Sequence, residues 1–300
     1  LLPASSGFEQ GMLNIGKIRN RGFELTLETV NVKTRQFQWS TSFNIAFNRN
    51  RILGLVDGQN TLQSSVSWET RFNSQFPYIS QVGKPTGMMY GFIYDGTYKA
   101  EDFDDKGNLV SGVPSFKGNA MQPGDMKYRD MNGDGVIDAN DRTSLGYPTV
   151  PEILYGFGAS VNYKRWDFSF FFQGTARVSL RMYDMHPFRD NQYSGFNMTQ
   201  YVADDHWSEA DPNPNAAYPR LDYRYNANNT QTSSFWIKNG SYLRLKSVEL
   251  GFTYKSLRAY LAGTNLFIMS PFKYWGPEMG SGNGLKYPLQ RVVKLGLQYN

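Results

Sequence analysis

The chain has 300 residues, 16% of them aromatic, with no cysteine and a net charge of +5 from 31 Lys and Arg against 26 Asp and Glu. The lack of cysteine excludes disulfides and thiolate chemistry. The positive charge is scattered along the chain and no nucleic-acid-binding motif accompanies it, which argues against a nucleic-acid partner. Mean hydropathy is −0.52, and no apolar run approaches the roughly 18 residues of a membrane helix. A transmembrane β-barrel, which needs apolar side chains only at alternate positions, fits this composition.

Two segments near the start of the chain alternate apolar and polar side chains. Residues 23–28 place Phe, Leu and Leu on one face and Glu, Thr and Glu on the other, and residues 37–48 follow the same period of two. This period is typical of strands, and the polar turn at 33–35 predicts that the two form a hairpin. Because Glu24 and Glu28 would be costly against lipid, their side is expected to line a hydrated interior.

The same alternation recurs along the rest of the chain. It predicts strands at 155–163, 166–172, 242–255, 257–268 and 291–300, and brings the expected total to about eight. The connections are unequal in length, since the turns near 33, 164 and 256 are tight whereas 52–90, 96–151 and 174–240 are long. Short turns on one rim and long loops on the other are typical of the periplasmic and extracellular ends of an outer-membrane barrel.

One segment within the long loops has the spacing of a calcium-binding loop. The expected ligands are Asp130, Asn132, Asp134, the carbonyl of Val136, Asp138 and Asp141, with Gly135 at the tight turn. Position twelve holds Asp where Glu is usual, so its shorter side chain must draw the chain closer or bind through one oxygen. We expect a lone structural Ca²⁺ site, at 130–141, that rigidifies an extracellular segment. The alternative is a surface turn rich in Asn, Asp and Gly that holds no metal.

Other candidate residues carry weaker signals. His186 and His206 lack the spacing of a zinc site, and acidic pairs such as Asp102 with Asp104 fit solvated loop residues better than glycosidase carboxylates. Loop aromatics are expected mainly to pack within the loops, with a minority touching a ligand; they are Trp68, Tyr78, Tyr98, Trp207, Tyr218, Tyr223, Tyr225 and Trp236. The sequence therefore predicts no catalytic residue and no organic cofactor, and it does not identify the substrate-binding residues.

Short motifs spread over nearly the whole chain resemble the SusC/RagA family of TonB-dependent transporters from the Bacteroidetes. They are Asn14-Ile15-Gly16, 20–24, Gly83-Lys84-Pro85, Tyr90-Gly91, Asp95-Gly96, Pro123-Gly124-Asp125, 128–142, Leu145-Gly146, Pro151, Gly156, Gln173-Gly174, 241–246 and 263–266.

The resemblance implies an all-β fold, a transmembrane antiparallel barrel of about 22 strands with an N-terminal plug, of which residues 1–300 are expected to be the C-terminal portion. It further implies a bacterial outer-membrane location, import of oligomeric glycans or peptides, a SusD-like surface lipoprotein as partner, and energy from a TonB complex acting on the plug. No plug or signal peptide is recognisable in the sequence. We therefore expect the chain to be a fragment that does not transport anything by itself. Barrels of this family commonly end on an aromatic residue, and we expect that residue to follow directly after Asn300.

Two other functions remain open at the level of sequence. A soluble, calcium-stabilised β-sandwich that binds carbohydrate also explains the alternation, the aromatics and the metal-type loop. A glycoside hydrolase on a β scaffold would use one of the acidic pairs. The sandwich predicts that the apolar stripes are buried between two sheets, whereas the barrel predicts that they form an exposed belt.

Overall fold

The computed structural model describes residues 16–55, 58–64, 77–118, 120–183, 185, 187–188, 197–222 and 225–299. One large antiparallel sheet forms a wall, and its strands run in the spatial order β1-β2-β11-β12-β15-β16-β18, with the short β17 paired to β15. The bounds of these strands are Lys17–Lys33 (β1), Phe37–Gly54 (β2), Ile153–Tyr163 (β11), Trp166–Ala176 (β12), Tyr242–Tyr254 (β15), Leu257–Thr264 (β16), Ile268–Met269 (β17) and Val292–Tyr299 (β18). The prediction of about eight wall strands is confirmed.

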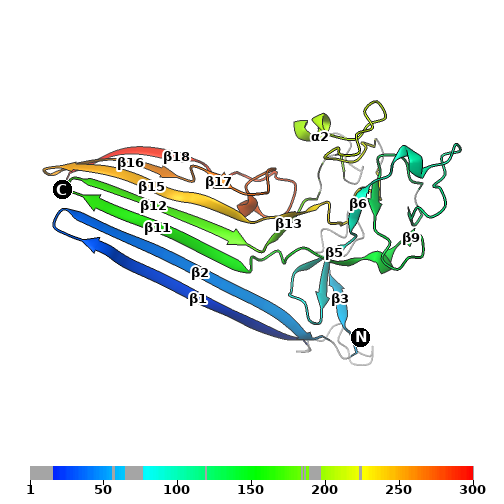
Figure 1. The fold of residues 1–300 in the computed structure, drawn as a ribbon, viewed down its shortest axis with the longest axis horizontal. Helices are drawn as coiled ribbons and strands as arrows, with labels where there is room; N and C mark the ends of the chain where they lie inside the picture. The colour runs from blue at the N-terminus through cyan, green and yellow to red at the C-terminus, as the bar shows by residue number, and fades with distance from the viewer. Residues whose placement is uncertain are drawn as a thin grey trace, which may run out of the picture.

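The long connections between wall strands are gathered at one end of the wall (Figure 1). They contain short strands, namely Thr61–Ser64 (β3), Tyr78–Gln81 (β4), Met88–Gly91 (β5), Tyr94–Thr97 (β6), Ser115–Phe116 (β7), Met126–Tyr128 (β8), Val136–Ile137 (β9), Thr143–Leu145 (β10), Ser179–Arg181 (β13) and Ile237–Asn239 (β14). The helical pieces are Ala100–Asp102 (η2), Ala139–Asp141 (η3), Gln200–Asp204 (α2) and Pro277–Met279 (η5). Of the helices in the described ranges, none is long and apolar enough to cross a membrane.

The predicted strand at 257–268 is wrong in its last part. The strand β16 ends at Thr264, and Asn265 adopts the left-handed backbone conformation, with φ of 55°. Its amide donates to the carbonyl of Lys246, and the amide of Leu245 donates to the carbonyl of Phe267. The chain therefore bulges at 265–267 and pairs with the first residues of β15 again as β17, because a single left-handed residue interrupts the ladder that the apolar pattern alone would continue.

The wall is open at both sides within the described residues, since β1 and β18 each pair with one neighbour only. The register is continuous from β2 through β11 to β12, so residues opposite one another share a face across several strands. One face carries most of the aromatic and aliphatic side chains of the alternating pattern, and the other carries mostly polar ones, including Glu28, Ser42 and Ser169. We call these the outer face and the inner face of the wall.

Candidate functional site

The outer face of the wall is an exposed apolar belt. Phe43 and Phe168 are 37% and 38% exposed, and Ile45 and Phe170 are half-buried by their neighbours on the same sheet. A β-sandwich would cover such side chains with a second sheet, so these exposures contradict the sandwich interpretation. At the rim with short turns the belt ends in large aromatic residues, which are Trp39, Tyr163, Trp166, Tyr254 and Tyr299. Such a girdle is typical of the lipid interface of outer-membrane barrels.

The inner face of the wall is polar and forms a shallow groove of about 620 Å³. Its lining includes Glu28, Ser42 and Ser169, and the hydroxyl oxygens of Ser40 and Ser160 lie 2.7 Å apart in a hydrogen bond. The expectation that the side bearing Glu28 is the hydrated one therefore agrees with the structure. Hydroxyl groups and carboxylates in this arrangement bind water and polar ligand groups by hydrogen bonds.

The loop end of the molecule has a compact core of its own. Its buried side chains come from segments far apart in sequence and include Phe92, Met126, Tyr128, Ile137, Leu180, Met182, Val202, Tyr218, Trp236 and Phe272. The rings of Phe92 and Tyr128 are stacked with centroids 5.1 Å apart. We call this folded loop end the loop platform. It presents an ordered surface beyond the rim of the wall, as a ligand-gathering or partner-binding surface requires.

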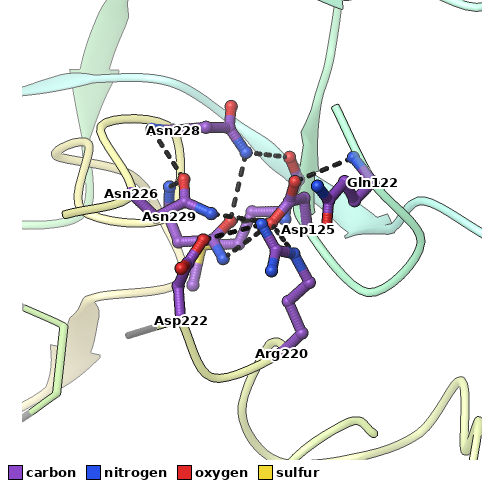
Figure 2. Close-up of polar contacts among 8 residues, drawn as sticks. Gln122, Asp125, Arg220, Asp222, Asn226, Asn228 and Asn229 are labelled. Carbon is purple, nitrogen blue, oxygen red and sulfur yellow. Dashed lines mark hydrogen bonds and ion pairs between the residues drawn. The ribbon is translucent and has the colours of Figure 1, made fainter. Parts of the chain in front are cut away.

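A buried carboxylate, Asp125, joins two of the loops that build the platform (Figure 2). It is 1% exposed, and it accepts hydrogen bonds from the Nε of Arg220 at 2.7 Å, the Nδ2 of Asn226 at 2.8 Å and the Nδ2 of Asn229 at 3.1 Å. The amide of Gln122 donates to its other oxygen at 2.9 Å. Both oxygens of this buried carboxylate therefore accept hydrogen bonds, three at one oxygen and one at the other, which offsets the cost of removing the charge from water.

The asparagines of this network also bind the backbone of the strand that follows Asp125. Asn229 accepts from the amide of Met126 at 2.8 Å, and Asn228 donates to the carbonyl of Met126 at 2.7 Å. Tyr128 donates to the carbonyl of Asn228 at 2.6 Å. The loop at 226–229 therefore pairs with β8 through side chains in place of a ladder. Through these bonds the network holds the loops of the platform together.

Gly124 is needed where it stands, beside the same network. Its φ is +84°, and a Cβ placed there would lie 2.2 Å from the ring of Trp207. Nearby, burial together with the negative charges of Asp125 and Asp102 raises the pKa of Tyr98. Tyr98 therefore stays neutral and donates to the carbonyl of Pro114 at 2.6 Å. Within the Pro-Gly-Asp motif, Gly124 thus supplies the left-handed backbone and the room for the Trp207 ring, and Asp125 supplies the buried carboxylate that joins the loops.

The calcium-type loop is a compact turn closed by its own acidic side chains. Asp130 accepts from the amides of Gly133 and Gly135 at 2.6 and 2.7 Å, which lowers the pKa of Asp130, with the bond from Gly135 as the largest cause. Asp141 is fully buried and accepts from the amides of Met131 and Asp138, each at 2.8 Å. The short side chain at position twelve thus draws the two ends of the loop together.

The remaining predicted ligands lie on the exposed side of this loop. Asp134 accepts from the amide of Val136 and from Asn132, and Asp138 caps η3. The amides of Ser115 in β7 and of Lys117 just after it donate to the carbonyls of Gly135 and Ile137, so the carbonyl of Val136 between them points to the other side. In the described part of the chain, no three His, Cys, Asp or Glu side chains converge closely enough to hold a metal ion.

The weaker candidates of the sequence are distributed as follows. His206 is bound to the carbonyl of Ala203 at 2.9 Å at the end of α2, whereas His186, Trp68 and Tyr223 lie outside the described residues. Four of the named loop aromatics are at least nine-tenths buried, namely Tyr98, Trp207, Tyr218 and Trp236. Their burial confirms the expected packing for these four of the six that the structure describes, and Tyr78 and Tyr225 are half-buried.

Sequence reasoning missed the partners of Asp125. Arg220, Asn226 and Asn229 lie about a hundred positions away in sequence, and no local pattern connects them to it. The only signal was the Pro-Gly-Asp motif at 123–125, which marks a turn without saying what the carboxylate binds.

Comparisons with known proteins agree with this fold. No protein-family model matches the sequence. The TonB-dependent receptor P26 of Formosa agariphila is 32% identical over 326 residues, which cover 99% of this chain and 30% of that protein. The TonB-dependent receptor SusC of Bacteroides thetaiotaomicron is 25% identical over 311 residues, covering 99% of this chain and 28% of that protein. The chain thus spans less than a third of the length of these relatives.

Solved structures share the fold at lower sequence identity. The RagAB peptide transporter superposes with a TM-score of 0.72 at 20% identity, over 99% of this chain and 31% of that chain. The open-open state of the RagAB peptide importer gives a TM-score of 0.70 over 99% and 30%. The wall is therefore a segment of a transmembrane antiparallel β-barrel, and the predicted fold class is confirmed. Over 99% of its length the chain is similar to TonB-dependent receptors of the SusC/RagA-like family, and it accounts for about 30% of the length of these relatives.

Proposed function

We propose that this chain is the C-terminal portion of a barrel that imports nutrients across the bacterial outer membrane. The observation that carries the proposal is the wall itself, with an exposed apolar outer face, a polar inner face and long loops folded at one end. Only a barrel immersed in lipid makes both faces favourable at once, because lipid covers the apolar side while water fills the polar side. The loop platform would then lie at the extracellular mouth.

The proposed cargo is an oligomeric ligand, a glycan or a peptide, captured at the mouth together with a SusD-like lipoprotein. The relatives support this class of function, since they are named TonB-dependent receptors and a peptide transporter and none is named an enzyme. The groove of hydroxyl and carboxylate groups on the inner face suits a polar, hydrated cargo. Energy would come from a TonB complex acting on a plug within the same barrel.

Uptake by the full-length receptor tests the proposal. Cells that carry the receptor are expected to accumulate a fluorescent glycan or peptide oligomer from a size-graded panel, and to lose that accumulation when either TonB or the SusD-like partner is deleted. A monosaccharide and a single amino acid serve as cargo controls, because they do not require capture by two proteins. Accumulation of every oligomer at the level of receptor-deleted cells, with the receptor correctly inserted, would contradict the proposed function.

We further propose that the loop at 130–141 binds Ca²⁺ as a structural ion. Its donor set is all oxygen, which a hard cation prefers, and Asp130 is held in the ionised form by backbone amides. The residues that would hold the ion are Asp130, Asn132, Asp134, the carbonyl of Val136, Asp138 and Asp141. An ion in the loop would stiffen the part of the platform in which β9 pairs with β7, and so the surface available to a partner.

Replacing Asp130 and Asp134 by Ala tests the calcium proposal. The wild-type receptor is expected to bind Ca²⁺ in the range of about 10⁻⁴ to 10⁻³ M that is typical of extracellular sites, with slower amide exchange in 130–141. The double variant should lose this calcium-dependent protection and bind the lipoprotein more weakly, while the barrel still inserts. The matched control changes the exposed acids Glu101 and Asp105 to Ala. Calcium-independent exchange in the wild type would overturn the proposal.

A further inference from the structure

Four arginines form two directly opposed pairs on the outer face of the β1–β2 hairpin. They lie at the end of the hairpin next to the loop platform, away from the turn that joins the two strands. Arg19 lies opposite Arg51, and Arg21 lies opposite Arg49. Because the side chains of a strand alternate between faces, positions 19 and 21 of β1 share a face, and so do positions 49 and 51 of β2. The register continues without a shift to Phe23 opposite Phe47, so the arginines stand on the same face as the apolar belt. We call these four residues the arginine quartet.

The quartet is electrostatically unfavourable as it stands. Like charges directly opposite one another in an antiparallel pair are destabilising, and here two such pairs are adjacent. Glu152 compensates one member only, with its carboxylate 3.2 Å from the Nε of Arg49, and it shares that carboxylate with Arg177 at 3.0 Å. Among the described residues, Arg19, Arg21 and Arg51 have no ion-pair partner, and Arg21 and Arg51 are exposed. The hairpin therefore offers positive charge that an external anion would neutralise.

The height of the quartet along the strand indicates where that anion lies. On β2, the outer-face positions from Trp39 to Phe47 extend about 26 Å along the strand at roughly 3.3 Å per residue. At a tilt near 45° they span about 19 Å of a hydrocarbon band that is about 25 Å tall. Arg49 and Arg51 follow at two and four residues beyond Phe47. Their backbone therefore stands about 23 and 28 Å above Trp39, at the edge of the hydrocarbon band on the loop side, from where their long side chains reach the lipid headgroups.

We infer that the arginine quartet binds the phosphate groups of phosphorylated lipid headgroups in the outer leaflet. Guanidinium groups bind phosphate through two parallel hydrogen bonds, and their continuity with the apolar belt places acyl chains directly below the phosphate. This geometry suits a lipid better than free phosphate, because one molecule satisfies both the charge and the apolar surface. At the opposite rim the outer face ends in the aromatic girdle, and the basic residues there, such as Lys33 and Arg35, lie in and beside a turn instead of forming opposed pairs above the apolar belt. The inference rests on the proposed membrane location of the barrel.

Lipid binding by the full-length receptor tests the inference. The purified receptor is placed in nanodiscs of phosphatidylcholine with added lipid A, in either its diphosphorylated or its dephosphorylated form. The wild type is expected to be stabilised by the phosphorylated form only, and to retain it in native mass spectrometry. The variant R21Q/R51Q should bind it about 30-fold more weakly, because each arginine near an anionic surface contributes roughly 1 kcal/mol. R21K/R51K, which keeps the charge but not the paired hydrogen bonds, should bind with an affinity between those of the wild type and R21Q/R51Q.

The matched control lies on the same hairpin at the opposite rim. K33Q/R35Q removes the same charge from exposed positions there and should leave lipid A binding unchanged. Heat-modifiable migration on gels shows separately that each variant forms a barrel, so a failure of the proposed function is distinguished from a failure of this inference. Equal binding of the phosphorylated and dephosphorylated lipid, equal losses in both glutamine variants, or displacement by inorganic phosphate alone would each overturn the inference for a correctly inserted receptor.

Discussion

Replacing Phe43 by Lys is expected to destabilise the inserted barrel by about 2–4 kcal/mol, which is the cost of a lysine on the lipid side at mid-membrane. Phe43 lies near the middle of the outer-face run on β2, opposite Leu27 on one side and Phe157 on the other. An ammonium group at this position has no counter-ion and no water within reach. Denaturant titration of the full-length receptor in lipid vesicles, followed by gel migration, measures the change.

Ser42→Lys is the matched control for this prediction. Ser42 is the preceding residue on the same strand, but it faces the inner groove and lies opposite Glu28. A lysine there meets water and a carboxylate, so the change in stability is expected to stay within about 0.5 kcal/mol. If the two lysines proved equally costly, the assignment of one face to lipid and the other to water would be wrong, and with it the membrane location of the wall.

Replacing Asp125 by Ala is expected to destabilise the loop platform by about 3 kcal/mol, the lower end of the cost of breaking a buried ion pair. The substitution leaves the donors of Arg220, Asn226 and Asn229 without their acceptor. Arg220 keeps a second carboxylate, Asp222, at 2.8 Å, which limits the loss. Hydrogen exchange of the full-length receptor should show faster exchange at 122–128 and 226–229, while the wall strands remain protected.

The variant Asp222→Ala distinguishes the contribution of the buried carboxylate of Asp125 from that of the more exposed carboxylate of Asp222. Asp222 also bonds Arg220, but its side chain is 29% exposed, so its ion pair is screened by water and is expected to contribute less than about 1 kcal/mol. Asp125→Asn keeps the shape and one acceptor oxygen and should fall between the two alanine variants. Equal acceleration of exchange in the two alanine variants would show that the network acts through Arg220 alone and that the asparagine contacts to Asp125 contribute little.

The wall could be predicted from the sequence because its information is local. In residues 37–48 the side chains alternate with a period of two, and this period by itself fixes which face each side chain occupies. The tight turns and the unequal connections then assign the two rims. Likewise, the spacing at 130–141 is contained within twelve consecutive residues, so the compact loop was recognisable, although whether it binds Ca²⁺ remains a proposal.

Tertiary structure alone decided the contents of the loop platform and the arginine quartet. The carboxylate of Asp125 and the guanidinium of Arg220 are neighbours only because two long loops fold over a shared core, and no periodicity relates residues so far apart. Arg19 and Arg51 look like ordinary surface charges until the register of β1 and β2 places them side by side. Alternation fixes the face of each side chain, whereas register and loop packing fix its neighbours, and the free energy of a charge depends on those neighbours.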